Sequence, residues 1–258
     1  MNEDHYEDIA GPDFGIASAP IRSAQGADLT AEQVRGILAS AAPDMPADLS
    51  GKSLENLDLS KVDFKRANLS GANLFGAKLD GANLTGASLS GAKLDLAWIM
   101  RANFTNADLS NASLLGLVVS SGLENNMAEA PIFKGAKFAG AHIIARLSRF
   151  DLSGADFTGA KMAPDLRNQS MGLTRTDLSG ANLSGANLSK ADLRLALMRF
   201  TNLAGASLRG ANLSGADLSG ADLTDADLTG ADATEADFGH AVLRSARGLE
   251  TVKGLTHQ

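Results

Sequence analysis

A large apolar residue recurs at every fifth position through most of this chain. The first series is unbroken from Leu49 to Leu114, and a second runs from Leu173 to Leu243, where only Met198 and Ala233 differ in size. A small residue, nearly always alanine, stands two positions before each centre, so the cell reads Ala-(Asp/Asn)-Leu-(Ser/Thr)-Gly. A period of five matches neither the 3.6-residue repeat of a helix nor the two-residue repeat of a strand.

The composition of the cell favours a short bent strand. Glycine at every fifth position would cost a helix roughly 1 kcal/mol each relative to alanine. In an extended segment, the alanine and leucine of one cell point to the same face, and the Asp or Asn between them points away. The two residues that follow, Ser/Thr and Gly, are turn formers. Each cell is therefore predicted to be a short strand plus a corner, and stacked corners form a solenoid.

This pattern closely resembles the pentapeptide-repeat family over residues 47–246. The resemblance implies an all-β fold, a right-handed quadrilateral parallel β-helix with four cells per coil and with Leu, Phe and Ala inside. We expect about nine coils, which at ~4.8 Å per coil would make a rod about 43 Å long.

The remaining segments divide the chain further. Residues 1–28 lack the repeat and are expected to be a flexible acidic N-terminal tail, although Tyr6, Ile9 and Phe14 leave a short docking peptide as an alternative. Residues 29–46 are predicted to form an N-terminal capping helix and linker, since Thr30–Gln33 fits a capping box. Residues 247–258 are expected to close the last coil. Interruptions near 118–131 and 163–172 are predicted to be projecting loops, either functional or simply tolerated.

Composition excludes several classes of protein. The net charge of −7 disfavours direct nucleic-acid binding, and no cysteine is available for disulfides. No stretch approaches the ~20 apolar residues that cross a membrane. The N-terminus is acidic, unlike a secretory signal. We expect a cytoplasmic protein, or a periplasmic one if an export signal was removed.

No enzyme site is predicted. A continuous Leu/Ala interior leaves no cavity for a substrate, and the four histidines lack metal-ligand spacing. We therefore expect no catalytic, cofactor-binding or metal-binding residues, and no cofactor.

The most informative departures from the cell are apolar residues in positions that should face outward. The first cluster is Leu96, Trp98 and Met100, and the second is Leu195, Leu197 and Phe200. Exposed apolar clusters usually mark contacts, and tryptophan is enriched in interface hot spots. These six residues are the candidate site for a protein partner or for self-association as a homodimer. The alternatives are that the loops or the tail cover them, or that they are idle surface.

A second candidate surface is acidic. Asp217, Asp222, Asp227, Asp232 and Asp237 all occupy the outward position, and no Lys or Arg lies between residues 212 and 237. Some pentapeptide-repeat proteins imitate duplex DNA and bind DNA gyrase, which protects the enzyme from inhibitors. This chain departs from them in its modest net charge, its long N-terminal extension and its lack of cysteine. The sequence thus favours a non-enzymatic interaction scaffold of unidentified partner, with a gyrase-binding or topoisomerase-binding DNA mimic as the alternative.

Overall fold

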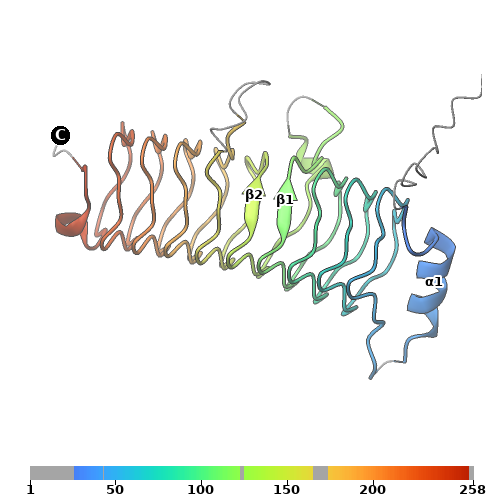
Figure 1. Cartoon of the computed structure of the whole chain (residues 1–258). Coiled ribbons are helices and arrows are strands. Elements are labelled where there is room, and N and C mark those ends of the chain that lie inside the picture. The colour runs from blue at the N-terminus through green and yellow to red at the C-terminus, as the bar shows by residue number, and fades with distance from the viewer. Residues whose placement is uncertain (1–25, 43, 123–124, 165–173, 256–258) are drawn as a thin grey trace, which may run out of the picture.

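The computed structural model describes residues 26–42, 44–122, 125–164 and 174–255. These residues form a rod of stacked coils with the helix α1 (Ala31–Ser40) across one end, as Figure 1 shows. The other regular elements are two strands, β1 (Ser113–Leu115) and β2 (His142–Ile144), and two 3₁₀ helices, η1 (Met127–Glu129) and η2 (Leu249–Thr251). Nearly all other ordered backbone is built from single parallel bridges between coils.

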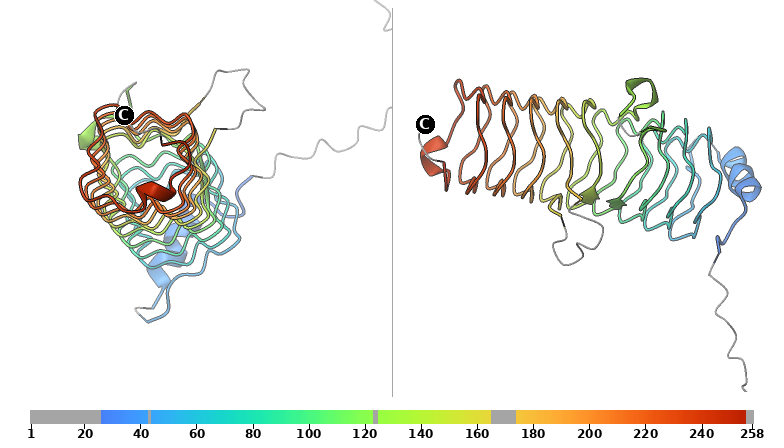
Figure 2. Two further views of the ribbon diagram at one scale, coloured as in Figure 1. Left: turned by 90° about the vertical axis from the view of Figure 1, so that its left-hand side faces the viewer. Right: turned by 90° about the horizontal axis from the view of Figure 1, so that it is seen from above.

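Each regular coil contains four cells, because parallel bridges join a residue to the one twenty positions later, as in Asp48 with Asn68. Seen along its axis in Figure 2, the rod is a four-sided tube. Its four sides are called walls here, and each wall consists of the outward residues, usually twenty positions apart, that parallel bridges connect from coil to coil. Wall A begins at Asp48 and ends at Arg247, and wall B begins at Ser53 and ends at Lys253. Wall C begins at Asp58 and ends at Asp237, and wall D begins at Asp63 and ends at Val242. Nine successive bridges along wall A correspond to a rise of about 43 Å.

The predicted centres form one continuous core. Leu49, Leu89 and Leu228 are fully buried, as are most of the alanines two positions before each centre. Near the middle of the rod the core contains phenylalanines: the ring centroids of Phe104 and Phe133 are 5.1 Å apart, and those of Phe138 and Phe157 are 4.8 Å apart. The Leu column predicted from the sequence is therefore the interior of the structure.

The Asp or Asn of a cell has a structural task as well as an outward position. The Asn83 side-chain oxygen accepts hydrogen bonds from the Thr85 backbone N–H at 3.1 Å and from the Thr85 hydroxyl at 2.7 Å. Asp222 accepts the same pair from Thr224. This local turn explains why Asp or Asn is followed two positions later by Ser or Thr.

Two interruptions shift the register and both border wall C. Across the first, Asn103 of wall D pairs with Ile132, so the chain leaves after wall C and returns on wall D. Across the second, Arg146 of wall C pairs with Asp177, so the chain leaves after wall B and returns on wall C. Figure 1 shows the segment around η1 projecting from the rod.

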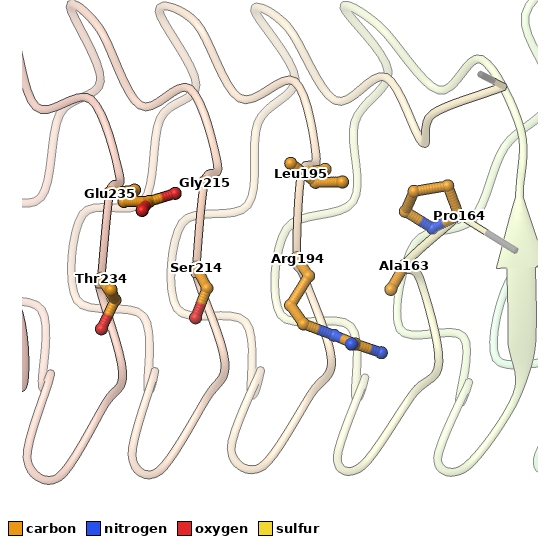
Figure 3. A pocket seen from close by; sticks show the side chains of 8 residues that line it. All are labelled: Ala163, Pro164, Arg194, Leu195, Ser214, Gly215, Thr234 and Glu235. Carbon is orange, nitrogen blue, oxygen red and sulfur yellow. The ribbon is translucent and has the colours of Figure 1, made fainter. Parts of the chain in front are cut away.

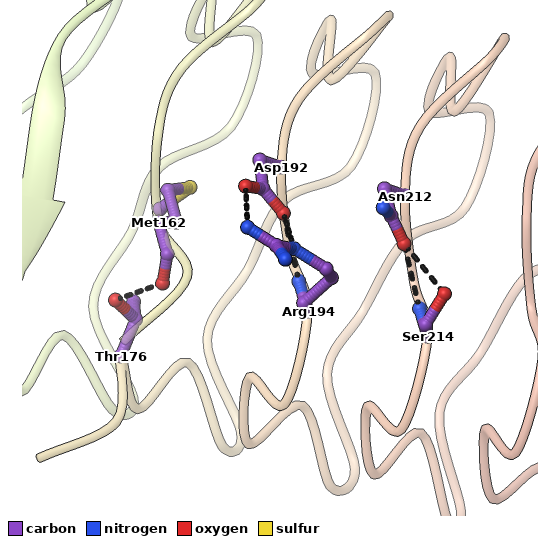
Figure 4. Close-up of polar contacts among 6 residues, drawn as sticks. All are labelled: Met162, Thr176, Asp192, Arg194, Asn212 and Ser214. Carbon is purple, nitrogen blue, oxygen red and sulfur yellow. Dashed lines mark hydrogen bonds and ion pairs between the residues drawn. The ribbon is translucent and has the colours of Figure 1, made fainter. Parts of the chain in front are cut away.

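A buried threonine completes the core where the second interruption ends. In regular cells the carbonyl of the centre accepts the N–H three residues later, as Leu69 does from Ala72. The single Thr176 hydroxyl proton is shared between the Ile143 and Met162 carbonyl oxygens, at distances of 2.9 and 2.8 Å. Figure 4 shows the contact with Met162. Because buried carbonyls need a donor, Thr176 occupies a position that is otherwise usually alanine.

Both ends of the rod are covered. Helix α1 starts at a capping box made by Thr30 and Gln33, and its Val34 is fully buried against the first coils. Leu249 and Val252 pack on the core at the other end. Residues 1–25 of the predicted tail lie outside the described residues. Residues 26–28 are described, and the Asp28 backbone N–H donates to the Ser53 carbonyl at 2.7 Å.

Candidate interaction surface

Wall C and its two bounding corners collect five of the six apolar residues singled out in the sequence. Trp98 and Leu197 stand on the wall itself, and Trp98 is 41% exposed. Leu96 and Leu195 occupy the corner shared with wall B, and Phe200 occupies the corner shared with wall D, where it is 73% exposed. Leu195 and Leu197 are half-buried. Residues about a hundred positions apart thus share one side of the rod.

The prediction that Met100 belongs to the exposed apolar surface is wrong, because its side chain is buried with only 8% exposed. The first interruption is the physical reason. The chain returns from it past this corner, where the Arg101 backbone N–H donates to the Glu129 carbonyl at 2.7 Å. The Glu129 carboxylate is itself held by Ser120 and Ser121. Met100 therefore packs beneath the segment that contains η1.

The corner residues carry backbone strain. Leu96, Leu195 and Phe200 have φ values of 58°, 59° and 54°, a region in which a side chain costs about 1–2 kcal/mol. The next coil has glycine at the same corner and makes room for each side chain. A Cβ atom at Gly220 would lie 2.5 Å from the Phe200 ring, for example. A strained, exposed phenylalanine is difficult to explain by stability alone.

Sequence reasoning missed two apolar neighbours of Trp98. Val118 is the next residue along wall C and pairs with Trp98 through a parallel bridge. Phe75 lies beside the corner of walls B and C, one coil before Leu96, and is 37% exposed. A signal for Phe75 was present, since it replaces the usual Ser or Thr of the cell.

A groove of about 270 Å³ runs along the same edge near the second interruption, as Figure 3 shows. Pro164, Leu195 and Gly215 line it together with Arg194 and Glu235. The Arg194 guanidinium is held by both carboxylate oxygens of Asp192 at 2.8 Å (Figure 4). The groove therefore extends the apolar surface around Leu195 and brings together no acid–base pair.

The five aspartates of the candidate acidic surface are spread over all four walls: Asp217 and Asp237 on wall C, Asp222 on wall D, Asp227 on wall A and Asp232 on wall B. Arg199 pairs with Asp217, Arg209 with Asp227 at 3.0 Å and Lys253 with Asp232 at 2.8 Å. Each cation comes from the neighbouring coil, roughly twenty residues away in the chain. The stretch that lacks Lys and Arg in the sequence is thus partly neutralised in space.

Hydrogen bonds lower the pKa of four of these carboxylates, those of Asp217, Asp222, Asp227 and Asp232. The Thr229 hydroxyl and backbone N–H, with Arg209, lower the pKa of Asp227 to about 2. Lys253 and Thr234 lower the pKa of Asp232, and Thr224 lowers that of Asp222. Burial raises the pKa of Asp217, but hydrogen bonds from Ser219 and Arg199 outweigh it and the net shift is downward.

The part of the chain that the structure describes also lacks clustered metal ligands and membrane-spanning helices. It contains no group of three or more potential His, Cys, Asp or Glu metal ligands. Among these same residues, no helix has the length and apolar character needed to cross a bilayer. Two acidic residues of the interruptions, Glu124 and Asp165, lie outside the described residues.

Comparisons with known proteins agree with the repeat. No curated protein matches the sequence. Similar solved structures include HetL from Nostoc sp. strain PCC 7120, a pentapeptide repeat protein involved in regulating heterocyst differentiation, with 28% identity over 88% of this chain and 98% of HetL and a TM-score of 0.38. Full-length QnrB1, a plasmid-mediated fluoroquinolone resistance protein, has 22% identity over 78% of this chain and 90% of QnrB1, with a TM-score of 0.29.

A third similar protein is alr5209, a pentapeptide repeat protein of Nostoc PCC 7120. It is 31% identical over 45% of this chain and 83% of its own length, with a TM-score of 0.19. The family model for pentapeptide repeats matches eight copies, at residues 47–76, 67–106, 173–199 and 221–247. The chain therefore belongs to the pentapeptide-repeat family.

Proposed function

We propose that this protein is a non-enzymatic interaction scaffold and that a protein partner docks on wall C. The observation that carries the proposal is the gathering of Trp98, Leu197 and Phe200, with Leu96 and Leu195, on a single side of a rigid rod. Both interruptions leave the coil next to this same wall. Loops on a rigid scaffold are frequent carriers of function.

The test removes the two most prominent side chains together. The double variant Trp98→Ala/Phe200→Ala is expected to lose specific partners in affinity purification from the native host, or to lose a homodimer measured by solution mass. The matched control is Val242→Ala, an exposed apolar residue on wall D. The proposal fails if the double variant keeps both the partner profile and the solution mass of the unaltered protein.

The alternative, a DNA mimic that binds DNA gyrase, receives less support. A mimic needs an extended negative surface, yet three of the five candidate aspartates form ion pairs with the next coil. The outward Asp also has a local role that Asn performs equally well elsewhere in the rod. A supercoiling assay decides the matter, since a mimic inhibits or protects gyrase at micromolar concentration and a scaffold of another kind has no effect.

A further inference from the structure

We propose that the chain's own N-terminal segment, residues 1–25, docks on the N-terminal half of wall C around Trp98. This inference rests on the proposed role of wall C as a docking surface and names an occupant for it. The segment contains five carboxylates, from Glu3, Asp4, Glu7, Asp8 and Asp13, against the single arginine Arg22. It also contains Tyr6, Ile9 and Phe14 as apolar anchors.

The surface offers matching apolar contacts. Leu96 is 49% exposed, with Trp98 beside it on the same coil and Phe75 and Val118 on the two adjacent coils. Leu96 holds a strained corner backbone, so its side chain is presented to solvent despite the cost. Four apolar side chains grouped within three coils form a patch suited to the aromatic and aliphatic residues of a short peptide.

The charge of this region is complementary to the segment. Lys61, Lys78, Arg101 and Arg149 are exposed on wall C or on its corner with wall D. The carboxylates along the same stretch are Asp58, Asp80 and, beside Arg101, Glu129. None of the four cations forms an ion pair with another described residue. Ion pairs in which both partners are described residues lie between residues 192 and 253. Exposed cations that are not held in close ion pairs, next to an apolar patch, favour an acidic, apolar ligand.

The segment is close enough to reach the patch. The described chain begins beside the first coil, where Asp28 bonds to Ser53 on wall B. Trp98 lies two coils further along, about 10 Å of rise, on the adjacent wall. The thirteen residues from Phe14 to Gly26 span up to about 40 Å when extended. Tethering so close gives an effective concentration in the millimolar range, which favours this occupant over a free peptide of equal affinity.

The chain provides its own reporters for a test. Trp98 is its single tryptophan and Tyr6, in the segment, is its single tyrosine. In the full-length protein we expect energy transfer from Tyr6 to Trp98 and protection of Trp98 from acrylamide quenching. Deletion of residues 2–25 is expected to abolish the transfer, shift Trp98 emission to the red and increase quenching. A synthetic peptide of residues 1–25 in excess is expected to reverse the last two changes.

Two variants test the charge argument. Lys78→Glu/Arg101→Glu is expected to reproduce the effect of the deletion on Trp98 quenching, and so is high salt, because screening shortens the Debye length to about 3 Å at 1 M. The control Lys134→Glu reverses an exposed charge on wall D and is expected to leave Trp98 unchanged. Far-UV circular dichroism verifies that each variant retains the coil.

Two results would overturn the inference. The first is identical Trp98 emission and quenching with and without residues 2–25. The second is energy transfer that grows with protein concentration, which would place the segment on a second copy. Neither result affects the proposed scaffold function, because partner capture is measured separately. If the scaffold function and the docking of residues 1–25 are both correct, the deletion variant captures more partner than the full-length protein. The Trp98→Ala/Phe200→Ala changes then abolish that capture.

Discussion

At the residue scale, some corners of the coil hold residues that suit the corner backbone, and others hold residues that strain it. Glycine satisfies the positive φ of a corner without strain, yet Phe200 keeps the same backbone conformation with a large exposed side chain. Asn is the non-glycine residue that tolerates this region best, and Asn106 and Asn111 follow that preference. Leu96, Leu195 and Phe200 do not, and all three border wall C.

Replacing Phe200 with glycine is therefore expected to stabilise the protein. Relief of the strained backbone contributes about 1–2 kcal/mol, which exceeds the roughly 0.5–1 kcal/mol entropic cost of glycine. Urea unfolding measures the change, with Asn106→Gly as a control of smaller effect. A large loss of stability in Phe200→Gly would mean that the ring supports the fold and would remove the argument that it is kept for binding.

The buried hydroxyl of Thr176 gives a second prediction at this scale. Thr176→Val keeps the shape but removes the hydroxyl proton that the buried Ile143 and Met162 carbonyls share, which should cost about 1–3 kcal/mol. Thr201→Val is the control of smaller expected effect, because its hydroxyl donates to the Leu178 carbonyl, which also accepts the Ala181 backbone N–H. Chemical denaturation compares the two losses of stability; equal losses would show that the Thr176 hydroxyl matters no more than one whose acceptor keeps a second donor.

At the scale of the coil, contacts between neighbouring cells decide how the surface behaves. An outward aspartate closes its own turn and also meets a cation from the coil stacked upon it. This arrangement explains how a chain can hold a run of seven acidic residues between 212 and 237 without presenting seven free negative charges.

Acid is expected to weaken the C-terminal coils through these carboxylates. Because the pKa of Asp227 is lowered from 3.8 to about 2 in the folded protein, its stabilising contribution is complete above pH 4. That contribution is lost as the pH falls from about 4 to about 2, since the unfolded chain binds the proton first. Asp227→Asn should flatten the fall in thermal stability over this window, and an unchanged profile would contradict the assignment.

The sequence predicts the cell well because the cell is a local object. Its turn, its inward Leu and Ala and its outward Asp are set by neighbours within five residues. The sharing of one wall by Trp98 and Leu197 is not local, since it depends on the register across both interruptions. Bridges there span 29, 19 and 31 residues instead of twenty, and no property of the repeat sets these lengths. The burial of Met100 escaped prediction for the same reason, because a returning loop covers it.

At the scale of the whole molecule, the rod is a one-dimensional stack in which each coil contacts only its neighbours. Its stability is then close to a sum of coil and interface terms, and a weak interface can uncouple the two ends. The weakest place is expected between the interruptions, where coils of irregular length meet. The phenylalanines from Phe104 to Phe157 fill this stretch and connect the regular halves.

Removing one of these rings should therefore divide unfolding into two steps. Phe138 contacts both Phe133 and Phe157, and its truncation to alanine should cost about 3–5 kcal/mol at that interface. Trp98 reports on the N-terminal half alone, whereas far-UV circular dichroism reports on the entire rod. In the unaltered protein the two urea transitions are expected to coincide, and in Phe138→Ala they should separate. The surface variant Val242→Ala should leave them coincident. Coincident transitions in Phe138→Ala as well would mean that coupling extends beyond adjacent coils, and a change on wall C would then be felt along the full length of the rod.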